Sequence, residues 1–116
     1  MDIEQWLRKF RTAWSNYDIE GVLELFTEDV EYWESPHQKV SSRAELRKEW
    51  GAILMQKEIE IHTDQYSSSG ELHTIIWSLS YFLDDVQHKW GGVYLIKLNS
   101  KGFCEYFFQT GEKAVE

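Results

Sequence analysis

The sequence predicts an α+β domain in which three helices of the amino-terminal half pack on a curved, mostly antiparallel sheet. Two observations carry this prediction. Helical periodicity ends near residue 55, and four strand candidates separated by turn-forming residues follow it. A chain of 116 residues suits one core, so we expect residues 1–116 to form a single domain. The expected order is helix, helix, strand, helix and then four strands.

The first helix is predicted from apolar residues that recur at three- and four-residue steps. Asp2 is the expected cap, and Gln5 completes a capping box with it. The opposite side of this helix is polar, which makes the helix amphipathic. Its expected inward residues are Ile3, Trp6, Leu7, Phe10, Ala13, Trp14 and Tyr17.

A short second helix is expected to begin after Asp18 and to carry Val22, Leu23 and Phe26 inward. Residues 27–29 break that pattern, and residues 30–34 then read as a strand that ends before Pro36. Ser42 and Glu45 form a second capping box, which predicts a third helix. The inward stripe of this helix is expected to be Leu46, Trp50, Ile53 and Leu54.

The rest of the chain is predicted as strands at residues 57–66, 72–83, 88–98 and 103–110. The turns between them are residues 67–70, 84–85 and 99–102, whose compositions favour hairpins. Gly91 and Gly92 lie inside a predicted strand and indicate a kink or bulge that would curl the sheet around the helices.

Two of these strands are apolar on both faces. Residues 72–83 place Ile75, Trp77, Leu79 and Tyr81 on one side and Ile76 and Phe82 on the other. Residues 103–110 place Phe107 on one side and Tyr106 and Phe108 on the other. One face can pack on the helices, but the second also needs a cover. We therefore predict a homodimer through the outer face of the sheet.

Composition limits the possible partners and compartments. Twelve basic against twenty acidic residues give a net charge of −8, which disfavours nucleic acid and anionic membranes as partners. No stretch approaches a membrane span, and the single cysteine, Cys104, cannot form an intrachain disulfide, so a cytoplasmic location is expected. No cofactor fingerprint and no metal-binding histidine spacing is present. With six each of Trp, Tyr and Phe, aromatic rings must line a core, a cavity or an interface.

Three segments resemble the nuclear transport factor 2-like superfamily, which includes ketosteroid isomerase and SnoaL-like polyketide cyclases. The segments are residues 18–30 (DIEGVLELFTEDV), residues 32–36 (YWESP) and residues 42–50, which open with SRAEL. The resemblance implies a cone-shaped fold whose open end leads to a pocket, and it agrees with dimerisation through the outer sheet. It implies little about function, because this fold hosts enzymes, binding proteins and association domains.

In the family's enzymes a carboxylate often precedes the proline that ends the first strand, and Glu34 holds that position. Strand alternation places Glu34 on the side of Tyr32, toward the expected pocket. Burial there would raise the pKa of Glu34, which suits a general base. The resemblance places Tyr94 where ketosteroid isomerase has a protonated acid, and Phe10 where it has a tyrosine. Phe10 has no hydroxyl to donate, so steroid isomerisation is not expected.

Three hypotheses for function follow. The leading one is a dimeric protein that binds a small apolar or aromatic molecule. The second is an enzyme of isomerase, cyclase or dehydratase type with Glu34 as general base and Tyr94 as its electrophilic partner. The third is an interaction module whose outer sheet binds a different chain. The expected pocket residues are Phe10, Trp14, Tyr32, Trp50, Trp77, Trp90, Phe107 and Gln109.

Each candidate also has a purely structural interpretation. Glu34 could be a solvated strand-end residue, and the aromatic rings could fill the core without leaving a cavity. His37 reads more readily as a loop residue than as a pocket residue. A solvated strand face explains a further alternating set of polar residues better than metal binding does. That set is Glu58, Glu60, His62 and Asp64.

Overall fold

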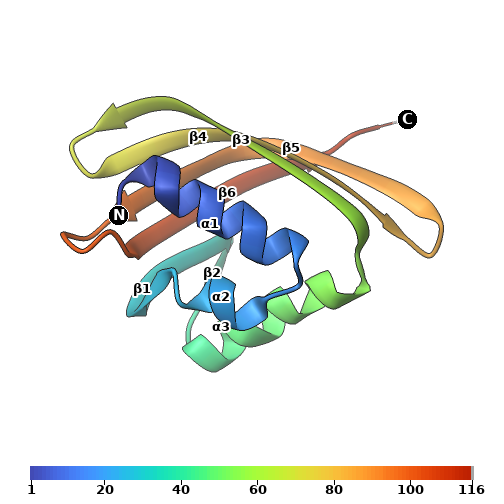
Figure 1. Cartoon of the computed structure of the whole chain (residues 1–116), viewed down its shortest axis with the longest axis horizontal. Coiled ribbons are helices and arrows are strands. Elements are labelled where there is room, and N and C mark those ends of the chain that lie inside the picture. Colours follow the sequence, from blue (N-terminus) through green and yellow to red (C-terminus); the bar gives the residue numbers. More distant parts are fainter. Residues whose placement is uncertain (116) are drawn as a thin grey trace.

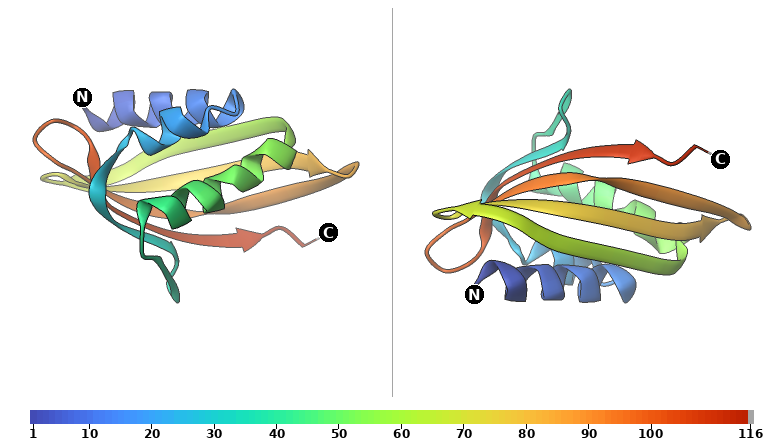
Figure 2. Two further views of the ribbon diagram at one scale, coloured as in Figure 1. Left: turned by 90° about the horizontal axis from the view of Figure 1, so that it is seen from below. Right: turned by 90° about the horizontal axis from the view of Figure 1, so that it is seen from above.

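The computed structural model describes residues 1–115 and confirms the α+β architecture. Helices α1 (Ile3–Ser15), α2 (Ile19–Leu23) and α3 (Arg43–Trp50) lie on one side of a curved six-stranded sheet (Figure 1). A 3-10 turn, η1 (Gly51–Met55), continues α3. Figure 2 shows the sheet bending around the helices. The strands are β1 (Phe26–Ser35), β2 (Gln38–Val40), β3 (Lys57–Ser69), β4 (Leu72–Leu83), β5 (Val86–Leu98) and β6 (Cys104–Lys113).

The sheet is mixed and open, with strand order β2-β1-β6-β5-β4-β3. Strands β3 to β6 form the expected antiparallel meander, while β1 lies parallel to β6 and places Tyr32 beside Phe107. The two rings stack with centroids 4.8 Å apart. This parallel pairing places Tyr32, two residues before Glu34, on the same face of the sheet as buried Phe107.

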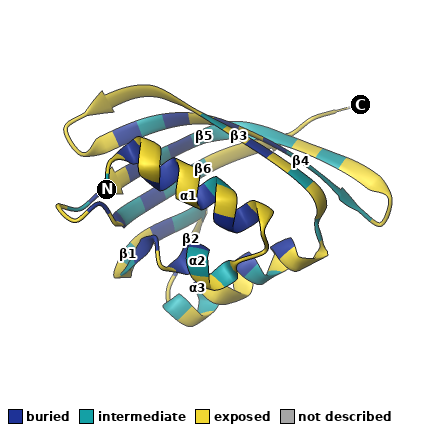
Figure 3. Ribbon diagram, in the orientation of Figure 1, coloured by how far each residue is buried: buried dark blue, intermediate teal, exposed yellow. Residues whose placement is uncertain are grey.

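Helix α1 follows the prediction closely, except that Tyr17, expected to face inward, lies after the helix and is 39% exposed. Both hydrogen bonds of the capping box are present. The Gln5 backbone N–H donates to the Asp2 carboxylate at 2.8 Å, and the Asp2 backbone N–H donates to the Gln5 side-chain oxygen. Trp6 and Phe10 on its inner face are fully buried. In Figure 3 that face is dark blue and the opposite face is yellow.

The prediction for the second helix was wrong at its end. Helix α2 stops at Leu23, and Phe26 opens β1, which is longer than the predicted residues 30–34. The Arg43 guanidinium donates to the carbonyls of Leu23 and Phe26, while the Cys104 backbone N–H donates to Leu25 O. These contacts satisfy the backbone after the helix, so the chain can become extended there.

Three further predictions need correction. Leu54 is 58% exposed, because the chain tightens into η1 after Trp50 and only Ile53 stays buried. The three-residue strand β2 was missed, since so short a segment has no readable alternation. The predicted turn at residues 67–70 shortens, because β3 continues to Ser69.

The predicted bulge at Gly91 and Gly92 is absent, and both residues pair in regular register with β4. Gly92 instead permits a close approach to β6, because a Cβ there would lie 1.9 Å from the Thr110 carbonyl oxygen. The predicted hairpin turn at Asp84 and Asp85 is present, with both residues at positive φ.

The predicted division of β4 and β6 into two faces is confirmed. Ile75 and Phe107 are fully buried on the concave face, whereas Ile76 is 43% exposed and Tyr106 and Phe108 are half-buried on the other. Homodimerisation through that outer face remains a prediction. Within residues 1–115, no helix is long and apolar enough to cross a membrane.

Candidate functional site

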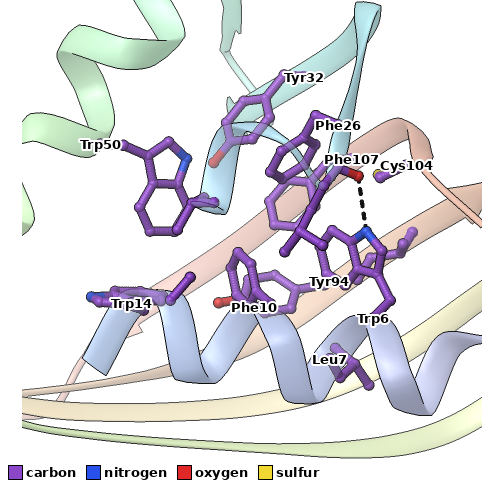
Figure 4. Packing of buried hydrophobic residues seen from close by; sticks show 14 of the residues in the cluster. Trp6, Leu7, Phe10, Trp14, Phe26, Tyr32, Trp50, Tyr94, Cys104 and Phe107 are labelled. Carbon is purple, nitrogen blue, oxygen red and sulfur yellow. Dashed lines mark hydrogen bonds between the residues drawn. The ribbon is translucent and has the colours of Figure 1, made fainter. Parts of the chain in front are cut away.

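A cavity of about 610 Å³ lies between α1, the α3–η1 segment and the concave face of the sheet. The structure brings all ten residues predicted for the site to this one cavity. Figure 4 shows Trp50 facing Trp14 and Phe10 of α1, with the Tyr32 hydroxyl group pointing toward the same rings. Their roles in binding or catalysis remain a prediction. The ten are Phe10, Trp14, Tyr32, Glu34, Trp50, Trp77, Trp90, Tyr94, Phe107 and Gln109.

Edge-to-face and stacked ring contacts hold the aromatic wall of the cavity in place. Trp50 meets Phe10 and Trp14 edge-on, at centroid distances of 5.4 and 4.9 Å. On the sheet, Trp77 and Tyr94 stack with centroids 5.2 Å apart. Such contacts are favourable beyond the area they bury, so they hold the rings of the wall in fixed orientations.

Glu34 lies near the end of β1 and lines the cavity from the sheet. Burial raises its pKa from 4.5 to about 7, and the negative charge of Glu49 on α3 adds to the rise. The nearby Gln109 side chain opposes the shift in part. The expected environment of Glu34 is therefore present, and the carboxyl group can both accept and release a proton near neutral pH.

Tyr32 and Tyr94 supply neutral phenols to the same cavity. Burial raises the pKa of both well above the usual value, and the charge of Glu34 raises it further. Tyr94 is only 1% exposed. Both hydroxyls therefore stay protonated at physiological pH, and each can donate a hydrogen bond to an oxygen atom of a bound molecule.

One indole nitrogen at the cavity has no partner. Within residues 1–115, Trp77 Nε1 is buried without a hydrogen bond. The Trp50 side chain interacts with the Tyr32 hydroxyl group and lowers its pKa in part, and Trp14 Nε1 donates to Gln56 Oε1 at 3.0 Å. A buried donor without a partner costs about 1–3 kcal/mol.

Sequence reasoning missed two polar residues of the cavity. Glu49 precedes Trp50 on α3 and reads as an ordinary solvated helix residue, so no sequence signal marks it. Gln56 follows η1 and orients Trp14. His37, predicted more readily as a loop residue, is exposed but lies at the cavity's edge.

Other candidates lie outside the cavity. Glu58, Glu60, His62 and Asp64 are all exposed on β3, and residues 1–115 contain no cluster of three potential metal ligands. Cys104 is buried, and burial raises the pKa of its thiol far above the usual value, which makes it unreactive. A smaller hollow of about 420 Å³ between β1, β2 and α3 has mixed charges, including Glu31, Lys39 and Arg43.

The family described as the SnoaL-like domain matches residues 7–98 of this chain. No curated protein matches the chain. Solved structures resemble it throughout. One is the epoxide hydrolase/cyclase-like enzyme SalBIII, which has a role in pyran ring formation in polyether salinomycin. It has a TM-score of 0.81 at 14% identity, and the match covers 94% of this chain and 89% of the SalBIII chain.

A putative scytalone dehydratase from Novosphingobium aromaticivorans has a TM-score of 0.78 at 13% identity, covering 98% of this chain and 86% of its own. A hypothetical protein with a ketosteroid isomerase-like fold from Catenulispora acidiphila, in complex with trimethylamine, has a TM-score of 0.76 at 11% identity. It covers 95% of this chain and 86% of its own. These likenesses confirm the predicted nuclear transport factor 2-like cone fold.

Proposed function

This chain belongs to the SnoaL-like domain family, and on that premise we propose that residues 1–116 form one domain whose cavity binds a small, largely apolar molecule. The observation that carries the proposal is the combination of fixed aromatic walls with a few polar groups around 610 Å³. Small-molecule sites have this character and size. In this proposal Trp14, Trp50 and Trp90 contact the body of the ligand, while Tyr94 and Gln109 fix its orientation.

The test is isothermal titration with 2-naphthol, a flat aromatic molecule with one hydroxyl group. Ala52 lines the cavity and is exposed, so Ala52→Trp should narrow the entrance and weaken binding at least tenfold. Ala44 is exposed on α3 but lies outside the cavity, and Ala44→Trp is the matched control. Equal binding by the two variants would place the ligand elsewhere.

A second candidate function is proton-transfer catalysis of isomerase, cyclase or dehydratase type, and the pKa of Glu34 near 7 favours it. In this proposal the Glu34 carboxylate removes a proton from a carbon beside a carbonyl group. Tyr94 donates a hydrogen bond to the enolate oxygen, and protonated Glu34 then returns the proton. As written, this step is an isomerisation, in which the net reaction moves one proton from one carbon to another.

Exchange of the α-protons of 2-tetralone in D₂O, followed by NMR, tests this second function. Glu34→Gln should reduce the exchange to the background rate, and Tyr94→Phe should slow it by about a hundredfold. Glu60→Gln, on the exposed face of β3, should leave the rate unchanged. Exchange that persists in Glu34→Gln would remove Glu34 as the base.

Dimerisation is also part of the proposal. The half-buried and exposed apolar residues of the outer face, including Ile76, Tyr106 and Phe108, would be covered by a second copy of the chain in the cytoplasm. Sedimentation velocity should show a dimer that Ile76→Glu converts to a monomer. A monomeric wild type would instead favour a different chain as the partner of this face.

A further inference from the structure

We infer that the ligand is an organic cation, with an alkylammonium centre that lies between Glu34, Glu49 and the aromatic wall of the cavity. The inference deepens the proposed binding function and rests on it. It names the chemical class of the ligand, because the residues around the cavity favour one sign of ligand charge over the other.

The charges around the cavity are unbalanced. Among the described residues that line it, Glu34 and Glu49 are acidic and none is Lys or Arg. The ion pairs found within residues 1–115 are Arg43–Glu28, Arg47–Glu20 and Lys97–Glu105, and none involves either of these carboxylates.

Glu34 is therefore a half-buried carboxyl group without a cationic partner among residues 1–115. A second carboxylate, Glu49, raises its pKa instead of stabilising its charge. Buried charges in proteins are normally paired, because an unpaired charge loses its hydration without compensation. A cation in the cavity would supply the missing partner.

The walls favour the same class of ligand. Four tryptophans line the cavity, and an indole face is the best aromatic surface for an ammonium group. Each such contact contributes about 0.5–1 kcal/mol at an exposed site and about 2 kcal/mol when it is desolvated. A quaternary or tertiary ammonium group also has an apolar surface, so it loses less hydration free energy in an aromatic cavity than a primary ammonium group does. The tryptophans are Trp14, Trp50, Trp77 and Trp90.

Other charge classes fit less well. An anionic ligand would meet two carboxylates and no Lys or Arg side chain, which would repel it. A neutral ligand could fill the cavity but would leave Glu34 unpaired. The net charge of −8 on the whole chain also attracts cations and repels anions at a distance.

Benzyltrimethylammonium and neopentylbenzene test the inference as a matched pair. They have the same shape, since a quaternary carbon in the second replaces the charged nitrogen of the first. At pH 8, above the pKa of Glu34, we expect the cation to bind at least tenfold more tightly in competition NMR titrations. Glu34→Gln should remove most of that preference without weakening the neutral molecule. Glu60→Gln, exposed on β3, is the matched charge control and should preserve the preference.

The outcomes separate the two proposals. Equal or tighter binding of neopentylbenzene would overturn the cation inference and leave the binding function intact. Failure of both molecules to bind would overturn the inference together with the proposal that the cavity accepts a small molecule. A preference for the cation that survives in a Glu34→Gln, Glu49→Gln double variant would also overturn the inference, because the charge selection would come from elsewhere.

Discussion

The two ends of the aromatic core use the same residue types differently. At the closed end, near the start of β1 and β6, Trp6 is fully buried and its indole N–H donates to the Leu25 carbonyl at 3.0 Å (Figure 4). Trp6 also meets Phe26 edge-on, with centroids 5.5 Å apart. At the open end, Trp77 is buried but its indole nitrogen has no partner within residues 1–115.

This difference indicates a division between stability and function. The indole N–H of Trp6 is satisfied by the chain itself, so this side chain supports the fold. At the open end the chain leaves the Trp77 donor without a partner and the Glu34 carboxyl group without a cationic partner within residues 1–115, which costs stability. Buried polar groups that lack partners, and so reduce stability, are found in proteins at sites where a ligand or a reaction uses them.

The largest expected effect is at the closed end. Trp6→Ala should destabilise the protein by about 4 kcal/mol, because it removes a fully buried indole and leaves a cavity. Trp90→Ala, at a half-buried ring that already faces the open cavity, should cost about 1–2 kcal/mol. Urea unfolding measures both, and Leu54→Ala at an exposed site should change stability by less than about 0.5 kcal/mol. Equal losses of unfolding free energy in Trp6→Ala and Trp90→Ala would contradict the division between a stabilising closed end and a functional open end.

A smaller effect, of opposite sign, is expected at Glu34. Its pKa is about 7 in the folded chain against 4.5 in the unfolded chain, so folding favours the protonated form. The stability from this group is complete below about pH 4.5 and is lost as the pH rises through 7. Glu34→Gln stays neutral, and it should therefore stabilise the protein by up to about 3 kcal/mol at pH 8 and very little at pH 4.5.

Urea unfolding of wild type and variant at the two pH values measures this difference. Glu60→Gln, an exposed carboxylate on β3, should show the same stability change at both values. A pH-independent difference for Glu34→Gln would mean that Glu34 is solvated, as its simplest structural interpretation holds.

Features fixed by local rules could be predicted from the sequence. The capping box of Asp2 and Gln5 and the period-2 alternation of residues 72–83 depend on neighbours in the chain, and both are present in the structure. The alternation also placed Glu34 on the cavity side of β1. All ten residues that these local patterns and the family resemblance predicted for the site lie at one cavity.

Features fixed by distant contacts could not be predicted. The end of α2 depends on Arg43 and on the backbone of Cys104, which are remote in sequence. Glu49 reaches the cavity only because α3 packs across its mouth, and nothing in the local pattern distinguishes it from the solvated residues beside it. The counts of acidic and basic residues likewise say nothing of how the charges are arranged around the cavity.

The finest test compares one substitution at the two ends. Trp6→Phe deletes a satisfied donor and leaves the buried Leu25 carbonyl with one partner fewer, so it should cost about 2 kcal/mol. Trp77→Phe deletes a buried donor that has no partner, so the gain from removing that donor should offset part of the lost packing and leave a net cost below about 1 kcal/mol. Both changes remove the same atoms, so urea unfolding of the two variants isolates the hydrogen bond. If Trp77→Phe costs as much as Trp6→Phe, the Trp77 indole nitrogen is satisfied without a ligand, and the open end is as complete as the closed one.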